Sequence, residues 1–346
     1  MERSIYRIID ANFNRAREAV RVMEEFCRFV LNSKPLSEQA KQFRHELSGA
    51  ISALDCSRLI ACRDTVSDVG VGQKVPNQLQ RKEIGDCFTA ACKRLVEALR
   101  VLAEMTQTID PAIADRIENL RYRAYTLEKD IVLLSEPAGK FKRVRLYVLI
   151  TENDPARIIS LTKSCAESGA DCIQLRAKGI DDDKLFAVAE DFVSLCGQAG
   201  VVSIINDRID IAVAAAADGV HLGQGDLPIE QVRKLAMAPM IIGKSTHSVE
   251  QLRSACDERV TYAALGPVFA TETKPDAKTV GTEYITAAKD ILADTGIGHL
   301  AIGGITLENL DLVLKAGAET VAVCSAITGA AEPAAMCRAF KEKILE

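Results

Sequence analysis

Three polar side chains alternate along one short apolar segment in the second half of the chain: Gln174, Arg176 and Lys178. In an extended strand, alternate residues lie on the same face. That face would carry an amide donor and two cations, a combination that suits a polyanion such as pyrophosphate. A solvated strand end rich in Lys and Arg is the alternative interpretation of this run by itself.

Two aspartates follow the next two apolar segments along the chain. Asp207 comes directly after Asn206, and Asp226 follows Gly223-Gln224-Gly225. Two carboxylates together with phosphate oxygens are the usual ligands of Mg²⁺. We therefore interpret Asp207 and Asp226 as candidate metal ligands, with a pair of surface aspartates as the alternative.

A second anion site is predicted near the end of the chain. Gly303-Gly304 precedes Thr306 and a helical segment, and Cys324-Ser325 precedes the last helix. Backbone N–H groups at such positions bind monophosphates, although Gly-Gly can also be only a tight turn. The two anion sites together suit the joining of two phosphorylated substrates with pyrophosphate leaving. The segment 270–281 is long enough to act as a lid that excludes water.

The elements that must position these residues are short β-rich segments that alternate with helical ones. Continuous apolar strands in this order over about 206 residues predict a (β/α)₈ TIM barrel in the α/β class, with an open doubly wound sheet as the alternative. In such a barrel the polar residues named above, and Ser245-Thr246-His247, all fall at the carboxyl ends of strands, where active sites lie. The predicted strands are Leu146–Thr151, Cys172–Arg176, Val202–Asp207, Gly219–Gln224, Ile241–Thr246, Tyr262–Phe269, His299–Ile305 and Thr320–Ile327.

The first half of the chain is predicted to be an all-α domain. Its first helix is expected to be capped by Asp10 or Asn12, and three further helices are expected over residues 37–54, 84–105 and 110–134. A Pro- and Gly-containing stretch over residues 135–140 predicts a boundary between a helical domain (1–138) and a barrel domain (139–346). The pattern E-A-x-R-V-x-x-E occurs at Glu18 and again at Glu97, so two helices could pack as a pseudo-symmetric pair, although helices generally favour these residues. The apolar stripe of the first helix comprises Phe13, Ala16, Val20, Met23, Cys27 and Val30.

Composition narrows the classes of protein. A length of 346 residues is typical of about two domains, and a net charge of -5 argues against a general nucleic-acid binder. No apolar run approaches the roughly 20 residues that span a bilayer, and residues 1–7 do not resemble a signal peptide. The eleven cysteines form no C-x-x-C pair, which favours reduced thiols in the cytoplasm and argues against a zinc site.

Residues from about 145 to 340 resemble the thiamine-phosphate synthase family, also called thiamine-phosphate pyrophosphorylase. The matching motifs occur in the family's order and cover nearly the whole second half. They are Gln174-Leu175-Arg176-x-Lys178, Asn206-Asp207, Gly219-Val220-His221-Leu222-Gly223-Gln224-x-Asp226, Gly266-Pro267-Val268-Phe269-x-Thr271-x-Thr273-Lys274, Ile302-Gly303-Gly304-Ile305 and Val323-x-Ser325-Ala326-Ile327.

The resemblance implies a transferase of thiamine biosynthesis. It would join hydroxymethylpyrimidine pyrophosphate to a thiazole phosphate, expected in its carboxylated form, and release pyrophosphate through a dissociative mechanism. By this resemblance, Asp207 and Asp226 would hold Mg²⁺, and Ser245 would face the pyrimidine. Arg176, Lys178, Ser245 and Lys274 would be the catalytic residues. Gln174, Arg176, Lys178, Asn206 and Lys274 would bind the pyrimidine pyrophosphate, and Thr271, Thr273, Gly304, Cys324 and Ser325 would line the thiazole phosphate site.

The first half resembles a helical domain that is often fused to this synthase and linked to phosphorylation of hydroxymethylpyrimidine phosphate, which would require ATP. From the residues alone, Asn12, Asn14, Arg15, Arg17 and Arg21 could bind phosphate, or could form a solvated, ion-paired face. The matching residues are Arg7-Ile8-Ile9-Asp10-Ala11-Asn12-x-Asn14-Arg15-Ala16-Arg17-Glu18, Glu24-Glu25-x-x-Arg28-Phe29, Phe43-Arg44-His45 and Arg63-Asp64-x-x-x-Asp68-Val69-Gly70.

Three alternatives remain at this point. A related branch of the same fold isomerises the thiazole phosphate and performs no coupling. Another phosphate-binding barrel isomerase or epimerase would need a paired acid and base, for which only His247 and Asp207 are available. The helical half could instead be a regulatory or oligomerisation module, in which case a homo-oligomer is expected. Small molecules are the expected partners, without nucleic acid or membrane.

Overall fold

The structure is a computed structural model that describes residues 2–73, 80–236, 238–271 and 278–346. The chain divides into two compact units, Met1–Val132 and Leu133–Glu346. The division falls six residues before the boundary predicted from the Pro- and Gly-containing stretch.

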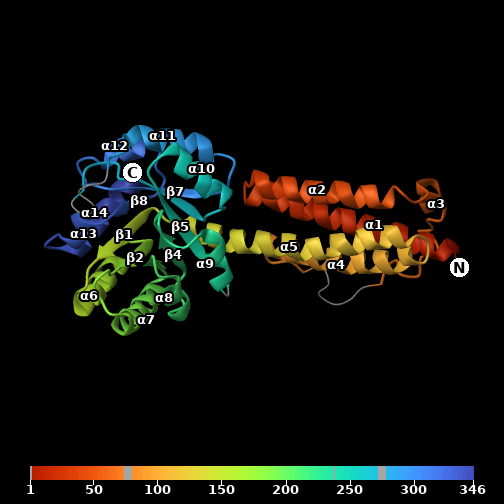
Figure 1. Ribbon diagram of the computed structural model, residues 1–346, viewed down its shortest axis with the longest axis horizontal. Helices are drawn as coiled ribbons and strands as arrows, with labels where there is room; N and C mark the ends of the chain where they lie inside the picture. The colour runs from red at the N-terminus through yellow and green to blue at the C-terminus, as the bar shows by residue number, and fades with distance from the viewer. Residues whose placement is uncertain (1, 74–79, 237, 272–277) are drawn as a thin grey trace. The chain divides into compact units, whose positions relative to one another are not determined.

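The described part of unit Leu133–Glu346 contains a closed barrel of parallel strands in which every strand pairs with its neighbours in chain order and β8 returns to β1 (Figure 1). This confirms the predicted (β/α)₈ barrel and excludes an open sheet. The strands are β1 (Leu146–Thr151), β2 (Cys172–Arg176), β3 (Val202–Asn206), β4 (Gly219–Leu222), β5 (Ile241–Thr246), β6 (Tyr262–Leu265), β7 (Gly298–Ile302) and β8 (Val321–Val323).

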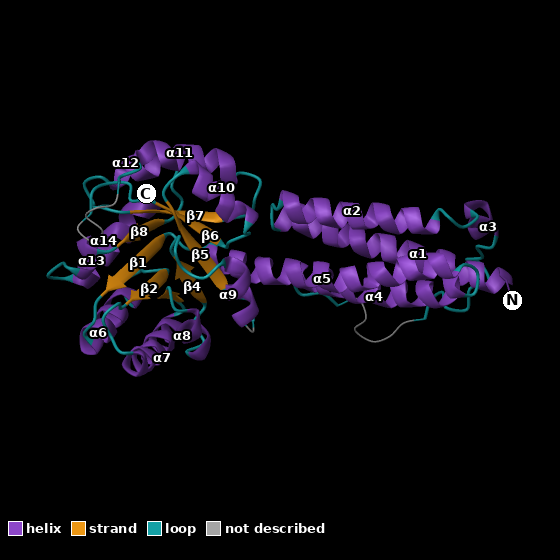
Figure 2. Cartoon of the chain, viewed as in Figure 1, coloured by secondary structure: helices purple, strands orange, loops and turns teal. Residues whose placement is uncertain are grey.

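Helices cover the outside of the barrel (Figure 2). The first of them, α6, begins at a residue pair typical of helix starts. Asp154 caps it by accepting a hydrogen bond from the N–H of Ala156, and proline occupies the first helical position. The next helix, α7, ends at Gly200, which has the left-handed backbone of a C-terminal cap. The helices are α6 (Pro155–Ala166), α7 (Asp182–Ala199), α8 (Ile209–Ala214), α9 (Ile229–Leu235), α10 (Val249–Asp257), α11 (Gly281–Leu292), α12 (Leu310–Lys315), α13 (Ser325–Thr328) and α14 (Pro333–Leu345).

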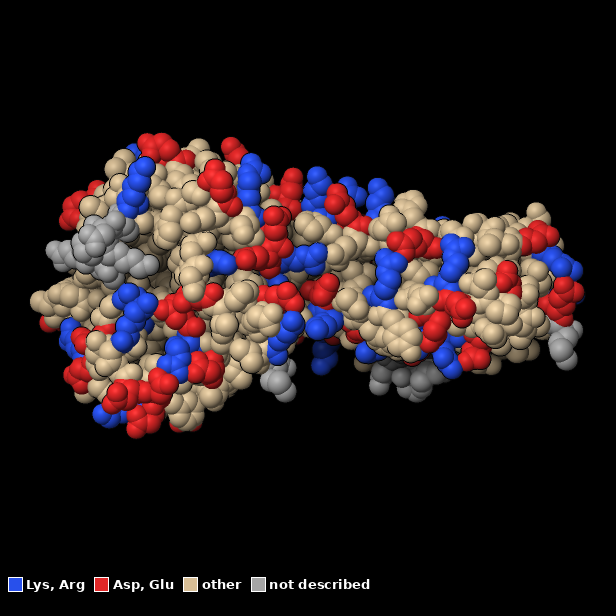
Figure 3. All heavy atoms as spheres, in the orientation of Figure 1, with Lys and Arg blue, Asp and Glu red and all other residues tan. Residues whose placement is uncertain are grey.

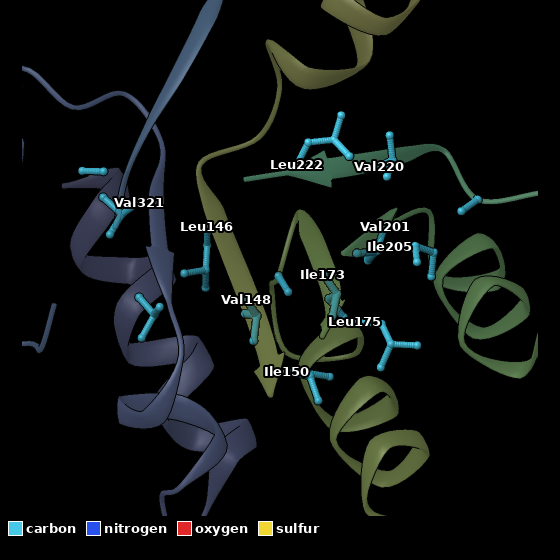
Figure 4. Close-up of a cluster of buried hydrophobic side chains, with 14 of the residues drawn as sticks. Leu146, Val148, Ile150, Ile173, Leu175, Val201, Ile205, Val220, Leu222 and Val321 are labelled. Atoms are coloured by element: carbon cyan, nitrogen blue, oxygen red, sulfur yellow. The ribbon is translucent and has the colours of Figure 1, made fainter. Parts of the chain in front are cut away.

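Alternation along the strands separates two apolar cores. Side chains that point outward, including Leu146, Val148 and Ile150 of β1, pack between the strands and the helices (Figure 4). The intervening Tyr147 points inward and belongs to a second cluster that fills the barrel. The inward cluster comprises Phe141, Val144, Tyr147, Cys172, Ile204, Ile241, Tyr262, Ala264, Leu300 and Ala322. Inward residues nearer the carboxyl ends of the strands are therefore the ones available to a ligand.

The amino-terminal end of the barrel interior is closed by Phe141, the last residue of helix α5 (Pro111–Phe141). Its ring stacks on Tyr262, the first residue of β6, with centroids 4.2 Å apart. A Cβ on Gly298, the first residue of β7, would lie 2.7 Å from the Phe141 ring. The predicted end of this helix near Leu134 was therefore wrong. Burial of Phe141 stabilises a last turn that includes Pro137, a residue that normally ends helices.

Unit Met1–Val132 is helical, as predicted. Helix α1 packs against α4 and α2, and the Phe26 and Phe88 rings stack with centroids 4.7 Å apart. Both copies of the E-A-x-R-V-x-x-E pattern lie in helices that contact each other, and each forms an Arg–Glu pair at i,i+4, Arg21–Glu25 and Arg100–Glu104. The elements are α1 (Glu2–Glu25), a π-helical turn η1 (Phe26–Val30), α2 (Lys34–Ile51), α3 (Cys56–Ala61), α4 (Ile84–Gln107) and the first part of α5.

The start of the first helix differs from the prediction. Helix α1 begins at Glu2, so Asp10 and Asn12 lie inside it and cap nothing. Both side chains are buried. Asp10 pairs with Arg63, which is distant in sequence. A capping rule that considers only neighbouring residues does not detect such a partner.

Within the described residues, no helix combines the length and apolar character needed to cross a bilayer. On the face shown in Figure 3, acidic and basic side chains are interspersed. A face of mixed sign lacks the concentrated positive charge by which nucleic-acid binders attract phosphate.

Candidate active site

A cavity of about 320 Å³ opens at the carboxyl ends of the barrel strands. Arg176 and Asn206 are the last residues of β2 and β3, and Gly303 and Cys324 directly follow β7 and β8. Residues from opposite sides of the barrel therefore share one space. Of the residues predicted from sequence, the cavity is lined by Gln174, Arg176, Asn206, Ser245, Thr271, Gly304, Cys324 and Ser325.

The cationic side of the cavity comes from β2 and the loop that follows it. Gln174 and Arg176 line the cavity together, as strand alternation predicted. Lys178 lies beyond the strand, outside the cavity lining, and its Nζ is 2.8 Å from Oδ2 of Asp207. The predicted row of three therefore splits into two side chains in the cavity and one that pairs with a carboxylate at its edge.

The two predicted metal ligands lie side by side. Asp207 has a left-handed backbone (φ 61°), and its N–H donates to the carbonyl of His221 over 2.8 Å. The Asp226 carboxylate accepts a hydrogen bond of 2.5 Å from the N–H of Gly223. These backbone contacts turn both carboxyl groups toward one another at the ends of β3 and β4.

Opposite pKa shifts follow from this proximity. Burial raises the pKa of Asp226, and the neighbouring Asp207 carboxylate raises it further. Burial also acts to raise the pKa of Asp207, but hydrogen bonds from Lys178 and Asp226 outweigh it, and the pKa is lowered. Two adjacent carboxyl groups repel each other when both are ionised. A divalent cation bound between them would remove this repulsion. The described residues contain no group of three or more His, Cys, Asp or Glu side chains that could hold a metal.

The opposite side of the cavity is shaped by Gly303 and Gly304. Both have positive φ angles, 106° and 64°. A Cβ on Gly304 would lie 2.3 Å from the carbonyl oxygen of Ala270, so this close approach of two backbone segments requires glycine. The Asn309 side chain holds the turn, donating to the Gly304 carbonyl over 2.8 Å and accepting from the Thr306 N–H over 2.9 Å. Cys324 and Ser325 line the cavity beside it.

Two predicted site residues, Thr273 and Lys274, lie outside the described residues, as does half of the predicted lid. Sequence reasoning also missed residues of the site. His221 of β4 lines the cavity and was singled out only as part of a motif. Tyr262 and Tyr147 lie beneath it in the barrel. Strand alternation places His221 on the inward face, two residues after Gly219, and this signal could have identified it.

In unit Met1–Val132 three of the five side chains proposed to bind phosphate form hydrogen bonds or ion pairs within the unit: Asn12, Asn14 and Arg21. Asn12 and Asn14 hydrogen-bond to backbone carbonyls one helical turn earlier, those of Ile8 and Asp10. Arg21 pairs with Glu24 and Glu25.

A long-range contact of this unit joins Asp10 to Arg63, whose guanidinium forms two hydrogen bonds of 2.7 Å to the buried carboxylate. Next to it, Arg7 donates to the carbonyl of Asp64. The segments that begin at Arg7 and at Arg63, which both match the helical domain described from sequence, are therefore in contact at α1.

Comparison with known proteins assigns relatives to both halves. Residues 146–327 match the thiamine monophosphate synthase family, and residues 7–130 match the ThiD2 family. A thiamine-phosphate synthase of Rhodopirellula baltica is 38% identical over 332 residues, which cover 94% of this chain and 88% of the relative. A thiamine-phosphate synthase of Thermosynechococcus vestitus is 36% identical over 340 residues, which cover 98% of this chain and 94% of the relative. Both relatives therefore align with the helical half as well as the barrel.

A solved structure, the thiamine phosphate pyrophosphorylase from Pyrococcus furiosus, is 31% identical, with a TM-score of 0.53. It covers 60% of this chain, and the match includes 100% of that protein.

Proposed function

Because the chain belongs to the thiamine monophosphate synthase family and is thus a transferase of thiamine biosynthesis, we propose that its barrel joins hydroxymethylpyrimidine pyrophosphate to a carboxylated thiazole phosphate. The products are thiamine phosphate, pyrophosphate and the carbon dioxide lost from the thiazole carboxylate. One observation carries the proposal in the structure: a single cavity is bordered by Arg176 and Asn206 on one side and by Gly304 and Ser325 on the other. Two phosphorylated substrates that occupy it together have their reacting atoms between the two anion sites.

The pyrophosphate is assigned to the side formed by β2 and β3. Arg176 presents a planar guanidinium that forms paired hydrogen bonds with phosphate oxygens, and Asn206 supplies an amide donor. Lys178 and Lys274 complete the positive charge. Departure of pyrophosphate leaves a pyrimidinylmethyl cation, which the thiazole nitrogen attacks. The side chains therefore act by neutralising charge and aligning the two substrates, without a nucleophile of their own.

Mg²⁺ is assigned to Asp207 and Asp226, whose adjacent carboxyl groups, one with a raised pKa, suit a divalent cation. When bound, Mg²⁺ neutralises the charge of the leaving pyrophosphate. Lys178 pairs with Asp207, so this carboxylate also holds the ammonium group close to the same phosphate.

The thiazole phosphate is assigned to the side formed by β7 and β8. The absence of a side chain at Gly304 allows a phosphate to approach the backbone, and the Ser325 hydroxyl supplies a further donor. Thr271, Thr273 and Cys324 complete this side. Ser245, on β5 between the two anion sites, is assigned to the pyrimidine ring.

The helical unit is assigned the phosphorylation of hydroxymethylpyrimidine phosphate with ATP, which would produce the substrate of the barrel. The buried Asp10 carboxylate, paired with the half-exposed Arg63, supports a built polar site, since a purely scaffolding helix needs no buried carboxylate. The competing proposal is a regulatory or oligomerisation module. A cytoplasmic location is part of the proposal, because all eleven cysteines are described and all are free thiols.

One experiment with two reaction tubes tests these assignments. Both contain purified chain, Mg²⁺ and thiazole phosphate; one adds pyrimidine pyrophosphate, and the other adds pyrimidine monophosphate with ATP. Thiamine phosphate in both tubes is the expected result. Product from the pyrophosphate alone would overturn the kinase assignment and leave the barrel assignment standing. No product in either tube would overturn the synthase assignment, and thiazole phosphate isomerisation would then be measured.

A further inference from the structure

A chain of buried hydrogen bonds crosses the barrel interior and ends at the cavity. The hydroxyl oxygens of Tyr147 and Tyr262 are 3.0 Å apart, and the Tyr262 oxygen lies 2.9 Å from Nδ1 of His221. Nε2 of His221 lies 2.9 Å from Oγ of Ser245. The two tyrosines are 1% and 0% exposed, so solvent does not replace these bonds. The function proposed above uses Ser245 but none of the three residues behind it.

The packing around Tyr262 holds its hydroxyl at this place. One side of the ring stacks on Phe141. On β5, a Cβ at position 243 would lie 2.1 Å from the Cζ atom of Tyr262, so only glycine there lets the ring extend to His221. The Ser245 backbone is fixed as well, because its carbonyl accepts a hydrogen bond of 2.5 Å from the Gln224 side chain.

The direction of the hydrogen bonds follows from the donors available. Burial raises the pKa of both tyrosines well above the usual value, so both remain protonated. The Gln174 side chain acts to lower the pKa of Tyr147, as a donor to the Tyr147 oxygen does, and this favours a Tyr147 hydroxyl that donates to Tyr262. Tyr262 then donates to Nδ1 of His221. A neutral histidine that accepts at Nδ1 carries its hydrogen on Nε2, and that hydrogen points at Ser245 Oγ.

We infer that Tyr262 and His221 are positioning residues that fix Ser245 Oγ as an acceptor, so that the Ser245 hydroxyl hydrogen is directed into the cavity as a donor to the ring of the bound pyrimidine. The identity of that ring rests on the proposed function, whereas the orientation of Ser245 does not. Tyr147, whose hydroxyl is hydrogen-bonded to that of Tyr262, supports the chain from below. A serine hydroxyl without these partners would rotate freely among its rotamers and present a donor only part of the time.

The orientation is measured directly by nitrogen NMR of ¹⁵N-histidine-labelled protein, with the His221 signals assigned by their loss in His221→Gln. At neutral pH, Nδ1 of His221 is expected to lack a hydrogen and Nε2 to carry one. Tyr262→Phe removes the hydroxyl but keeps the stacked ring, and it is expected to shift the Nδ1 signal. The opposite tautomer in the wild-type chain, or no response to Tyr262→Phe, would overturn the inference.

The effect on catalysis is measured by a double-mutant cycle with Ser245→Ala. Tyr262→Phe alone is expected to lower kcat/KM for the pyrimidine substrate about tenfold, the value of one well-placed hydrogen bond, and to leave KM for the thiazole phosphate unchanged. In the Ser245→Ala background the same change is expected to have less than about a twofold effect, because Tyr262 acts through Ser245. Equal effects in the two backgrounds, or equal losses for both substrates, would contradict the positioning role.

Matched variants separate positioning from folding. The amide of His221→Gln reaches the place of Nε2 and is expected to retain more activity than His221→Asn, which cannot reach Ser245. Tyr284→Phe is the control for loss of a buried tyrosine hydroxyl, because Tyr284 bonds to Thr246 and Ser248 outside the cavity lining. A wild-type chain without synthase activity would overturn the proposed function and the pyrimidine as acceptor. The NMR result would still decide the orientation of Ser245.

Discussion

The Nζ atom of Lys178 lies 2.8 Å from Oδ2 of Asp207, so the chain brings its own cation to the carboxylate pair at the ends of β3 and β4. This contact helps to keep the pKa of Asp207 low although the residue is partly buried. Asp226, next to it, has a raised pKa. The site therefore has one carboxylate that is paired with a lysine and a second carboxyl group whose pKa is raised by burial and by its neighbour.

Replacing either aspartate is expected to abolish the stimulation of turnover by Mg²⁺. Asp207→Asn and Asp226→Asn should each lower kcat/KM about 100-fold, since a bound cation contributes several kcal/mol to stabilising a leaving pyrophosphate. The measurement is a Mg²⁺ titration of the initial rate. Asp210→Asn is the control, because Asp210 is an exposed carboxylate that pairs with Arg208 on the outside of the barrel. An unchanged Mg²⁺ titration in both site variants would disprove the metal assignment.

Neutralising Lys178 should affect one substrate only. Lys178→Gln removes an ammonium group assigned to the pyrophosphate, so KM for the pyrimidine substrate is expected to rise about tenfold while KM for the thiazole phosphate is unchanged. The pKa of Asp207 should rise in the same variant, because the ammonium that lowers it is gone. Steady-state kinetics with each substrate varied in turn measure the first effect. Lys184→Gln, at an exposed pair with Asp181, is the comparison. Equal increases for both substrates would count against the assignment.

Adding one methyl group at Gly304 should close the thiazole phosphate site. The Cβ of Gly304→Ala would lie 2.3 Å from the Ala270 carbonyl oxygen, at a φ of 64°. We expect KM for the thiazole phosphate to rise about tenfold and the free energy of unfolding to fall by about 1–2 kcal/mol. Gly197→Ala in α7 has nothing within 4 Å of its new Cβ and should raise the free energy of unfolding by about 0.5 kcal/mol. Kinetics and urea denaturation measure both, and a normal KM in Gly304→Ala would refute the assignment.

The stability of the barrel should depend on Asp218 at acid pH. Burial acts to raise the pKa of Asp218, but Lys140, 2.8 Å away, and the N–H of Ser203 outweigh it, so the pKa is lowered in the folded state. This carboxylate therefore stabilises the fold above its unfolded pKa, and the contribution is lost as pH falls through the lowered folded value.

Because Lys140 is partly exposed, the contribution should be only about 1 kcal/mol. Asp218→Asn is expected to reduce the loss of unfolding free energy between pH 7 and about pH 3, measured by denaturant unfolding. The exposed Asp294→Asn should not change it. If Asp218→Asn loses as much unfolding free energy at low pH as the wild-type chain, the lowered pKa of Asp218 does not contribute to stability.

The pairing of Arg63 with Asp10 should matter for one reaction of the chain and not the other. Arg63→Ala leaves a buried carboxylate without its partner, so the helical unit is expected to melt at a lower temperature. Synthesis of thiamine phosphate from the monophosphate and ATP should be lost, whereas synthesis from the pyrophosphate should continue. Arg100→Ala, at an exposed pair with Glu104, provides the comparison. Loss of both reactions in Arg63→Ala would indicate that the helical unit supports the fold of the barrel.

Much of the barrel could be predicted because its signals are local. Strands β1, β2 and β5 begin and end at the predicted residues. The predictions for β6 and β8 ran too far, since the apolar run continues into segments that turn across the cavity or start α13. The helical unit was predicted less well: neither the burial of Asp10 nor the continuation of α5 through Pro137 can be read from neighbouring residues. Asp10 and Phe141 are each held by partners far away in sequence, Arg63 and Tyr262.

The sequence by itself determined that several side chains face the cavity, because a strand alternates with a period of two and its carboxyl end has a fixed place in a parallel barrel. Gln174, Arg176 and Ser245 follow from that rule alone. Only the tertiary structure decided that Asp207 lies against Asp226 and that Tyr262 reaches His221. Those contacts depend on the register between strands, the closure of the barrel and the space left by Gly243. They are properties of several segments at once, and no single segment encodes them.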